Sequence, residues 1–472
     1  MLFEKIKSPG LAHNSYLIGD NGEAAVIDPR RDVEVYLDKA SAEGFTIDYV
    51  LETHRNEDYL IGSKEIARKT GAEIWRADDY LDYEYGQPME EGKEIEVGRL
   101  LLEGLHTPGH TPGSFSYVLY GYEGEPWMVF TGDVLFAGDV GRVDFLGEDK
   151  LKETAGDLYD SIYDKILPLG DEVILCPAHG AGSVCASAIA DREWTTIGIE
   201  KNLNPHLQYE SREEFIEEVG QMLEYPPYFT RMEEWNLTCA PFLSDKKRPK
   251  ALSPDEFADI QDEGAVVIDT RTEVSFAGAH IPGSLSIWKD NVPSFAGWFV
   301  DVDSPILLVS DEGYPEEEIK HLYRTGFDNI KGYLSGGMIS WHMQARSSET
   351  IETIRVEELC EIMKGPKDCR ILDVRSEDEL EEEGEIEGAI NIHITQLPDH
   401  YEEIPENVKV YIFCGSGLRS MTAASLLKRE GFENIGVTLG GLTGWRSSTC
   451  PRGETQSSKE RGLKIADSLW LG

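Results

Sequence analysis

The sequence predicts an α/β protein made of several domains, and three observations support this. Short β-rich stretches, such as 24–28 and 127–131, alternate with helical patterns at 33–43 and 150–166. The second half contains a domain-sized repeat. Candidate functional side chains follow β-rich stretches, and open α/β sheets place their chemistry at the carboxyl ends of strands. A chain of 472 residues can form two to four domains, each with its own core.

Residues 1 to about 245 form one predicted α/β unit. His54 follows the β-rich stretch 49–52, and His179 follows the stretch 173–176. A basic segment at 244–250, with the sequence SDKKRPK, indicates an exposed linker into the next domain. The first predicted domain therefore spans residues 1–245.

The second half of the chain consists of two similar copies. The segment VIDTR at 267–271 matches ILDVR at 371–375, which lies 104 residues later. The segments 326–330 and 431–435 also match, as do two Gly-Gly pairs that are each followed by a tryptophan. A repeat of about 100 residues is a domain rather than a solenoid unit. We therefore predict two tandem α/β domains near 251–346 (the first copy) and 353–448 (the second copy).

The charge balance excludes several classes of partner. The chain has 88 acidic and 44 basic residues, a net charge of −44, which opposes binding to nucleic acid or to anionic membranes. No apolar run approaches the roughly 20 residues of a membrane span, and the N-terminus lacks the apolar core of a signal peptide. Seven scattered cysteines fit a reducing compartment. We expect a cytoplasmic protein; the oligomeric state stays open, a homo-oligomer included.

A broken metal-binding motif occupies residues 53–59, THRNEDY. It has the shape H-x-H-x-D-H, with Asn56 and Tyr59 in place of the second and third histidines. His54 remains, as do His110 in HTPGH and Asp133 in TGD. Two imidazoles and one carboxylate are the ligand set of mononuclear non-haem Fe(II) oxygenases. The pattern predicts one Fe(II) per chain, with zinc as the alternative.

The remaining positions of the motif suggest supporting roles. Asp58 and His179 would belong to a second metal site, but Tyr59 is a poor ligand, and we expect that site to be empty. Asp58, His179 and Asn56 would then form hydrogen bonds to the metal ligands or to water.

Two further side chains near the motif have alternative interpretations. Arg142, nine residues after Asp133, either anchors a substrate carboxylate or forms a surface ion pair. Cys185 either lines a substrate channel or is a packed thiol.

The second copy contains a candidate nucleophile. The β-rich run 411–413 ends at Cys414, and a loop leads to a helical pattern from Ser420. Backbone N–H groups of such a loop and a helix N-terminus bind anions and stabilise a thiolate. The loop residues Gly415, Ser416 and Gly417 supply these groups, and Arg419 adds a cation suited to sulfite or thiosulfate.

The first copy lacks this chemistry. Aligned without gaps, Ser310 stands at the position of Cys414, and Pro315 at that of Arg419. Asp311 and Glu312 would repel an anion. We expect the first copy to be inactive.

These motifs resemble known families. The ordered set of candidate ligands resembles the metallo-β-lactamase superfamily, which implies an αββα sandwich: His54, Asp58, His110, Asp133 and His179. The segment FAGDVGRVDF at 136–145 is similar to the persulfide dioxygenase branch of that superfamily. This resemblance implies iron held by His54, His110 and Asp133, with Arg142 contacting the carboxylate of a thiol carrier. The two copies resemble rhodaneses, whose active cysteine matches Cys414.

The resemblance to persulfide dioxygenase–rhodanese fusions covers almost the whole chain and implies a function. We expect oxidation of a small thiol persulfide by dioxygen to sulfite, coupled to sulfur transfer at Cys414 that makes or uses thiosulfate. One alternative is a zinc thioester hydrolase of the glyoxalase II type joined to a rhodanese. Another is a non-catalytic sulfur carrier with a vestigial N-terminal site.

Overall fold

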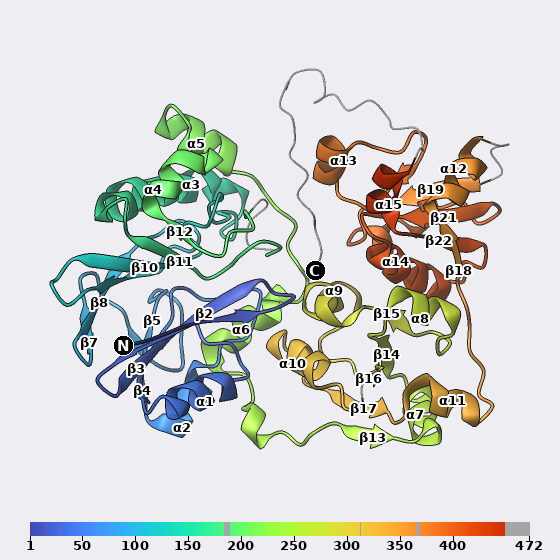
Figure 1. The fold of residues 1–472 in the computed structure, drawn as a ribbon, viewed down its shortest axis with the longest axis horizontal. Helices are drawn as coiled ribbons and strands as arrows, with labels where there is room; N and C mark the ends of the chain where they lie inside the picture. The colour runs from blue at the N-terminus through green and yellow to red at the C-terminus, as the bar shows by residue number, and fades with distance from the viewer. Residues whose placement is uncertain (184–188, 312, 365–368, 449–472) are drawn as a thin grey trace. The chain divides into compact units, whose positions relative to one another are not determined.

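The computed structural model describes residues 1–183, 189–311, 313–364 and 369–448 (Figure 1). Contacts divide the chain into two compact units. Unit 1 contains Met1–Arg248, Asp290–Asp303 and Glu317–Asp328, and unit 2 contains Pro249–Lys289, Ser304–Glu316 and Asn329–Gly472. Helices α9 (Val292–Phe299) and α10 (Glu316–Arg324) of the first copy therefore lie almost wholly in unit 1. The predicted boundaries of the three domains stay a prediction.

Unit 1 is built on two six-stranded sheets. The first has the order β1-β2-β3-β4-β5-β6: β1 Leu2–Ser8, β2 His13–Asp20, β3 Glu23–Ile27, β4 Thr46–Leu51, β5 Glu73–Arg76 and β6 Gln87–Pro88. The second has the order β12-β11-β10-β9-β8-β7: β7 Glu94–Val97, β8 Leu100–His106, β9 Phe115–Tyr120, β10 Pro126–Gly132, β11 Ile174–Pro177 and β12 Thr195–Thr196. Most strand residues are buried because each sheet is covered on both faces.

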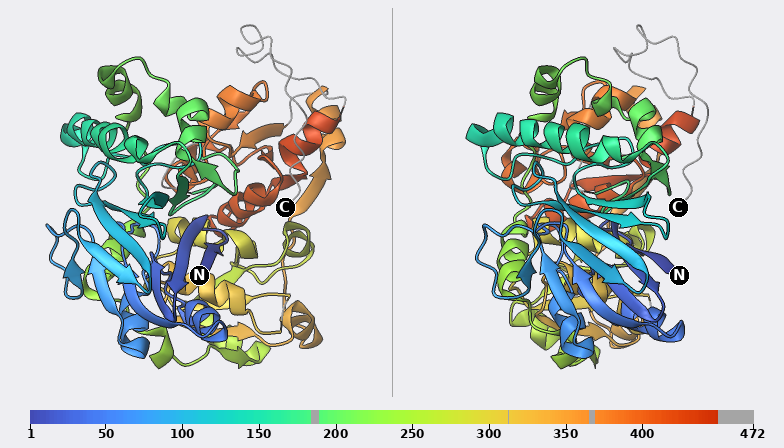
Figure 2. Two further views of the ribbon diagram at one scale, coloured as in Figure 1. Left: turned by 60° about the vertical axis from the view of Figure 1, so that its left-hand side comes forward. Right: turned by 90° about the vertical axis from the view of Figure 1, so that its left-hand side faces the viewer.

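Helices cover the outer face of each sheet. Tyr16 and Ile27 of the first sheet pack with Tyr117 and Phe130 of the second in the central core. Outside the first sheet lie α1 (Glu34–Ala42) and α2 (Ser63–Thr70), and outside the second lie α3 (Leu151–Asp160), α4 (Ile197–Leu203) and α5 (Arg212–Val219). The right-hand view of Figure 2 shows these layers. The predicted αββα sandwich is confirmed.

Unit 2 contains two five-stranded parallel sheets of the same topology. The first has the order β13-β17-β16-β14-β15: β13 Lys250–Leu252, β14 Val266–Asp269, β15 Leu285–Ser286, β16 Ile306–Val309 and β17 Ile330–Leu334. The second has the order β18-β22-β21-β19-β20: β18 Glu352–Arg355, β19 Cys369–Asp373, β20 Ile390–Asn391, β21 Lys409–Phe413 and β22 Ile435–Leu439. Matching strand orders confirm that the second half is an internal repeat.

Corresponding helices accompany the two sheets. The first copy has α7 (Pro254–Asp262), α8 (Glu273–Gly278) and α11 (Gly337–Met343); the second has α12 (Val356–Lys364), α13 (Glu377–Glu383), α14 (Leu418–Arg429) and α15 (Gly441–Ser447). Trp341 and Trp445 occupy equivalent places in the two cores. Among the described residues, no helix combines the length and the apolar composition needed to cross a bilayer.

Candidate metal centre and sulfur-transfer loop

The three candidate metal ligands lie together at one end of the sandwich. His54 follows β4, His110 lies in the loop between β8 and β9, and Asp133 follows β10. All three are buried, and their ligand atoms lie within 4.8 Å of one another. The Asp133 Oδ2 atom is 3.8 Å from His54 Nε2 and 3.6 Å from His110 Nε2. The structure thus brings the set together, while the ligand roles stay a prediction.

Hydrogen bonds orient His54 toward the centre of this group. The Thr53 hydroxyl donates to Asp28 Oδ2 at 2.8 Å, so its oxygen accepts from His54 Nδ1 at 2.9 Å. Such partners fix the tautomer of a metal-binding histidine. Gly132 makes this close packing feasible, since its φ is +53° and a Cβ there would meet the Thr53 Oγ1 atom at 2.5 Å.

His110 is held in the same way. Its Nδ1–H donates to the Arg142 carbonyl at 3.0 Å. The Nε2 atoms of His54 and His110 are both buried, and neither has a hydrogen-bond partner among the residues that the structure describes. Buried polar atoms without partners are costly, so two such nitrogens facing one carboxylate fit a bound cation.

The candidate second metal site is occupied by a network of its own residues. The His179 Nδ1–H donates to Asp133 at 2.8 Å, and its Nε2–H donates to Asp58 Oδ2 at 2.9 Å. Burial lowers the pKa of His179, but the Asp133 and Asp58 carboxylates outweigh it and raise the pKa well above its ordinary value. The raised pKa favours the protonated form of His179 between the two carboxylates.

Asn56 and Tyr59 support the backbone of the loop. The Asn56 amide donates to the His54 carbonyl at 3.2 Å. Tyr59 packs against His13 with ring centroids 4.0 Å apart, and its hydroxyl donates to the Asp28 carbonyl at 3.4 Å. Burial raises the pKa of Tyr59 well above its usual value, which keeps the phenol protonated and a poor ligand.

Glu57 is a site residue that the sequence reasoning missed. It is buried; its Oε1 atom accepts from Arg55 at 3.2 Å, and its Oε2 atom lies 3.7 Å from His110 Nε2 with no hydrogen-bond partner in the described part of the chain. Burial raises its pKa, but His110 and Arg55 outweigh burial and lower it. The signal was an acidic residue at an unassigned position inside the motif. Its Oε2 atom can accept a hydrogen bond from a molecule bound beside His110.

Arg142 is engaged within the protein. Its Nε and Nη2 atoms each donate to Asp144 at 2.7 Å, and its Nη1 atom donates to the Glu224 carbonyl at 3.2 Å. The ion pair is buried rather than at the surface. A substrate carboxylate would have to share or displace Asp144, and the anchoring role stays a prediction. Cys185 lies outside the described residues.

Cys414 follows β21 directly and is buried. Its sulfur accepts a hydrogen bond from the Gly417 amide at 3.1 Å. Gly417 has a φ of +109° and begins the turn into α14, so the N-terminus of this helix lies beside the sulfur. The helix starts at Leu418, two residues earlier than the sequence pattern indicates. Of the loop amides, that of Gly417 contacts the sulfur directly.

Arg419 is paired with Glu379, a second residue that the sequence reasoning missed. The guanidinium donates to the two carboxylate oxygens of Glu379 at 2.6 and 2.5 Å. Glu379 also forms a capping box with Ser376 at the start of α13. The S-x-x-E pattern signals that box but not the contact with Arg419. An incoming anion therefore meets an arginine whose charge is already balanced.

The first copy lacks the side chains of this arrangement. Ser310 follows β16, and Asp311 comes after it. At the spacing of 104 residues, Ser275 stands at the position of Glu379, just as Pro315 stands at that of Arg419. The thiol, the arginine and its acidic partner are all missing from the matching positions. The inactivity of this copy stays a prediction.

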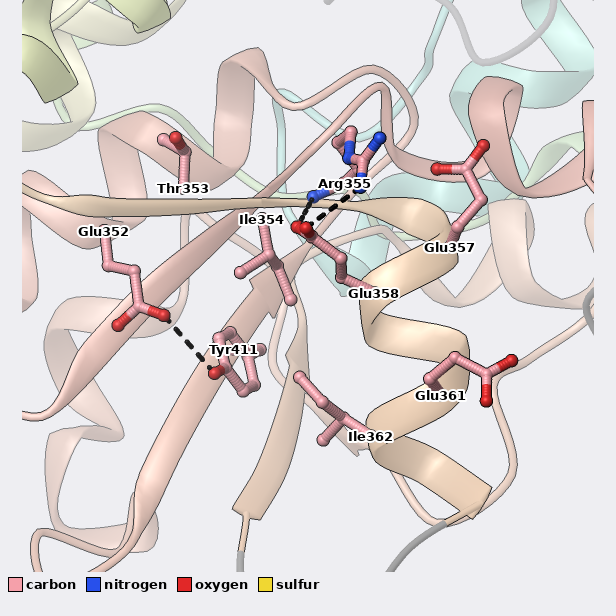
Figure 3. A pocket seen from close by; sticks show the side chains of 9 residues that line it. All are labelled: Glu352, Thr353, Ile354, Arg355, Glu357, Glu358, Glu361, Ile362 and Tyr411. Carbon is pink, nitrogen blue, oxygen red and sulfur yellow. Dashed lines mark hydrogen bonds and ion pairs between the residues drawn. The ribbon is translucent and has the colours of Figure 1, made fainter.

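A surface cavity in the second copy does not belong to the sulfur-transfer loop. It has a volume of about 680 Å³ and lies between β18, α12 and the side of β21 that carries Tyr411 (Figure 3). Four carboxylates line it: Glu352, Glu357, Glu358 and Glu361. Cys414 is not among the lining residues. Its acidic lining does not suit an anionic sulfur compound.

Comparison with known proteins identifies the family. The metallo-beta-lactamase superfamily model matches residues 8–179, and the rhodanese-like domain model matches 253–344 and 356–448. Human ETHE1, a mitochondrial persulfide dioxygenase, is 30% identical over 240 residues, which cover 47% of this chain and 82% of that protein. The chain belongs to the metallo-beta-lactamase superfamily and continues into two rhodanese-like domains.

A hydrolase and a solved metallo-beta-lactamase structure are also similar to this chain. The Haemophilus influenzae hydroxyacylglutathione hydrolase GloC is 31% identical over 233 residues, 45% of this chain and all of that protein. A metallo-beta-lactamase structure from Staphylococcus aureus is 31% identical with a TM-score of 0.62, covering 71% of this chain and 98% of the other. The relatives support an enzyme of the metallo-hydrolase and dioxygenase family with rhodanese-like domains.

Proposed function

We propose that this protein oxidises a small thiol persulfide at a single Fe(II) and transfers sulfur at Cys414, within sulfur metabolism. The observation that carries the proposal is the asymmetry of the N-terminal site. Among the described residues, the Nε2 atoms of His54 and His110, next to Asp133, have no hydrogen-bond partner, whereas at the candidate second site both ring nitrogens of His179 are hydrogen-bonded to Asp133 and Asp58. The set of His54, His110 and Asp133 suits a metal, whereas the candidate second site already contains His179, whose pKa is raised.

Each residue has a task in the proposed reaction. His54, His110 and Asp133 would hold Fe(II), which supplies binding and activation of dioxygen together with the persulfide. Thr53 and the Arg142 carbonyl keep the imidazoles oriented. The free oxygen of Glu57 accepts a hydrogen bond from water or from the bound thiol compound. Oxidation of the terminal sulfur followed by hydrolysis releases sulfite and the thiol.

Sulfur transfer at Cys414 proceeds in two balanced steps. The thiolate attacks the outer sulfur of R–S–SH, which gives Cys–S–S⁻ and releases R–SH. Sulfite then takes the outer sulfur, which forms thiosulfate and restores Cys–S⁻. The reverse direction uses the same residues. The Gly417 amide and the N-terminus of α14 stabilise the negative sulfur in each step.

We expect one iron per chain after anaerobic expression without added zinc. The reason is that both ring nitrogens of His179 are hydrogen-bonded to carboxylates, one of them Asp58 Oδ2, and that Tyr59 is a poor ligand. Metal analysis and anomalous diffraction at the iron edge provide the measurement. Two metals a few ångströms apart, with Tyr59 or Asn56 as ligands, would contradict this prediction.

The similarity to GloC supports a second candidate, a thioester hydrolase. Oxygen uptake with a panel of thiol persulfides, run beside hydrolysis of a panel of glutathione thioesters, separates the two functions. The proposal requires persulfide-dependent oxygen uptake that follows iron content. Thioester hydrolysis that follows zinc content, without oxygen uptake, would favour the hydrolase.

We expect Ser310→Ala to leave the sulfur-transfer rate unchanged. The first copy has neither a thiol nor an arginine at the matching positions, so Ser310 has no part in a sulfur-transfer loop there. Thiosulfate–cyanide turnover measures the rate. A tenfold fall, about 1.4 kcal/mol of activation barrier, would show that the first copy takes part in sulfur transfer.

A further inference from the structure

Helix α10 of the first copy is packed into unit 1 by buried ionic bonds. The Arg324 side chain is about 1% exposed, and its Nε and Nη2 atoms donate to the two carboxylate oxygens of Asp32 at 2.7 and 2.8 Å. Asp328, which follows the end of α10, accepts from Arg31 Nη1 and Nη2 at 2.6 and 2.8 Å. Two consecutive residues, Arg31 and Asp32, are thus each held by a paired contact.

The main chain of Arg324 reaches a second segment of unit 1. Its carbonyl accepts a hydrogen bond from the Leu60 amide at 2.8 Å. Leu60 belongs to the metal loop, which we define as residues 53–62 and which carries His54. One residue therefore holds the loop after β3 through its side chain and the metal loop through its backbone.

Hydrogen bonds also join residues 28–32 directly to the metal loop. Asp28, at the end of β3, accepts from the Thr53 amide and hydroxyl at 2.8 Å each, and Thr53 in turn orients His54. The Gly62 amide donates to the Pro29 carbonyl at 2.7 Å. Movement of the 28–32 segment would therefore be transmitted to the His54 imidazole.

In the second copy, the residues that match Arg324 and Asp328 are exposed. The segment Gly326–Ile330 matches Gly431–Ile435, so Arg324 corresponds to Arg429 and Asp328 to Glu433. Arg429 is exposed, and Glu433 is 84% exposed where it pairs with Lys428. The buried contacts are specific to the copy that has lost its cysteine.

We propose that the first copy acts as a brace for the metal loop, with Arg324 as its positioning residue. The copy has lost the groups needed for sulfur transfer, yet its helix fixes two loops that orient a candidate metal ligand. Without Arg324, Asp32 would keep its contact with Arg30 Nε at 3.1 Å but would lose both hydrogen bonds from the Arg324 guanidinium. The loop after β3 would then be held less firmly, and with it the metal loop.

Arg324→Met in the full-length chain tests this role, and Arg231→Met is the matched control. Like Arg324, Arg231 forms an ion pair between residues 1–248 and the first copy, but its partner Asp303 is 73% exposed. We expect Arg324→Met to loosen the metal loop: hydrogen–deuterium exchange of peptides covering 53–62 should rise relative to both wild type and the control. Iron transfer to a chelator should be about 10-fold faster, the lower range for loss of a supporting contact.

Two comparisons keep the outcome decisive. Arg324→Lys retains the charge and should recover part of the protection from exchange. Unchanged exchange over 53–62 in Arg324→Met, or an equal rise in Arg231→Met, would overturn the proposal. Because exchange is measured without metal as well, a wild-type protein that binds no iron would refute the proposed function while the exchange data still decide the role of Arg324.

Discussion

We expect His54→Ala to abolish persulfide-dependent oxygen uptake and to leave thiosulfate–cyanide sulfur transfer unchanged. His54 is one of three convergent groups, and its Nε2 atom has no hydrogen-bond partner among the described residues. Its loss leaves one imidazole and one carboxylate, too few ligands to hold Fe(II) against solvent. The sulfur-transfer loop has its own nucleophile and its own helix terminus, so its rate should not depend on the metal.

The measurement is oxygen uptake with a thiol persulfide, together with iron content and thiosulfate–cyanide turnover on one preparation. His206→Ala is a suitable control, since this partly exposed histidine pairs with Asp139 and is not one of the three convergent residues. The control should retain both iron and oxygen uptake. Loss of both activities in His54→Ala, with the fold intact by circular dichroism, would contradict the independence of the two sites.

The fold and the convergence of the candidate ligands could be predicted because both depend on local patterns. β4 of the first sheet and β10 of the second are each followed by a polar residue of the set, and the two strands end on the same side of the sandwich, which brings those residues together. The repeat can be recognised because its matching segments keep nearly constant spacing. For these features, secondary structure and motif order carry enough information.

Contacts between distant residues could not be predicted in this way. Arg324 and Asp32 are 292 residues apart, and Arg419 and Glu379 are 40 apart. No periodicity joins such pairs, and each charge is equally compatible with solvent exposure. The pair formed by Arg142 and Asp144 differs, since the two charges are only two residues apart. The family resemblance implies that Arg142 contacts a substrate, so its pairing with Asp144 was not predicted.

Burial also changes the meaning of several motif residues. Glu57 occupies an unassigned position of the motif, and only the packed structure shows its oxygen 3.7 Å from His110 Nε2. The sequence predicts that His179 supports the ligands, and its placement between two carboxylates explains how one metal could suffice. These features arise from packing of loops that follow different strands.

We expect Cys414→Ser to remove sulfur transfer and the sulfur adduct, while oxygen uptake at the proposed iron site continues. The thiol lies at the end of β21, where the Gly417 amide donates to the sulfur and α14 begins. A serine hydroxyl at this place is not ionised near neutral pH and is a poor nucleophile toward sulfur. Turnover with thiosulfate and cyanide should fall to background.

Mass spectrometry after incubation with thiosulfate identifies the sulfur carrier, with Cys239→Ser as the matched control. Burial raises the pKa of Cys239 above its usual value, and burial raises the pKa of Cys176 to about 12, so neither thiol forms much thiolate near neutral pH. One added sulfur should therefore appear on the Cys414 peptide in wild type and in Cys239→Ser. Because Arg419 is balanced by Glu379, we expect the adduct to need thiosulfate in excess. Sulfur found on Cys185 or Cys239 instead would show that the loop at Cys414 does not carry the transfer.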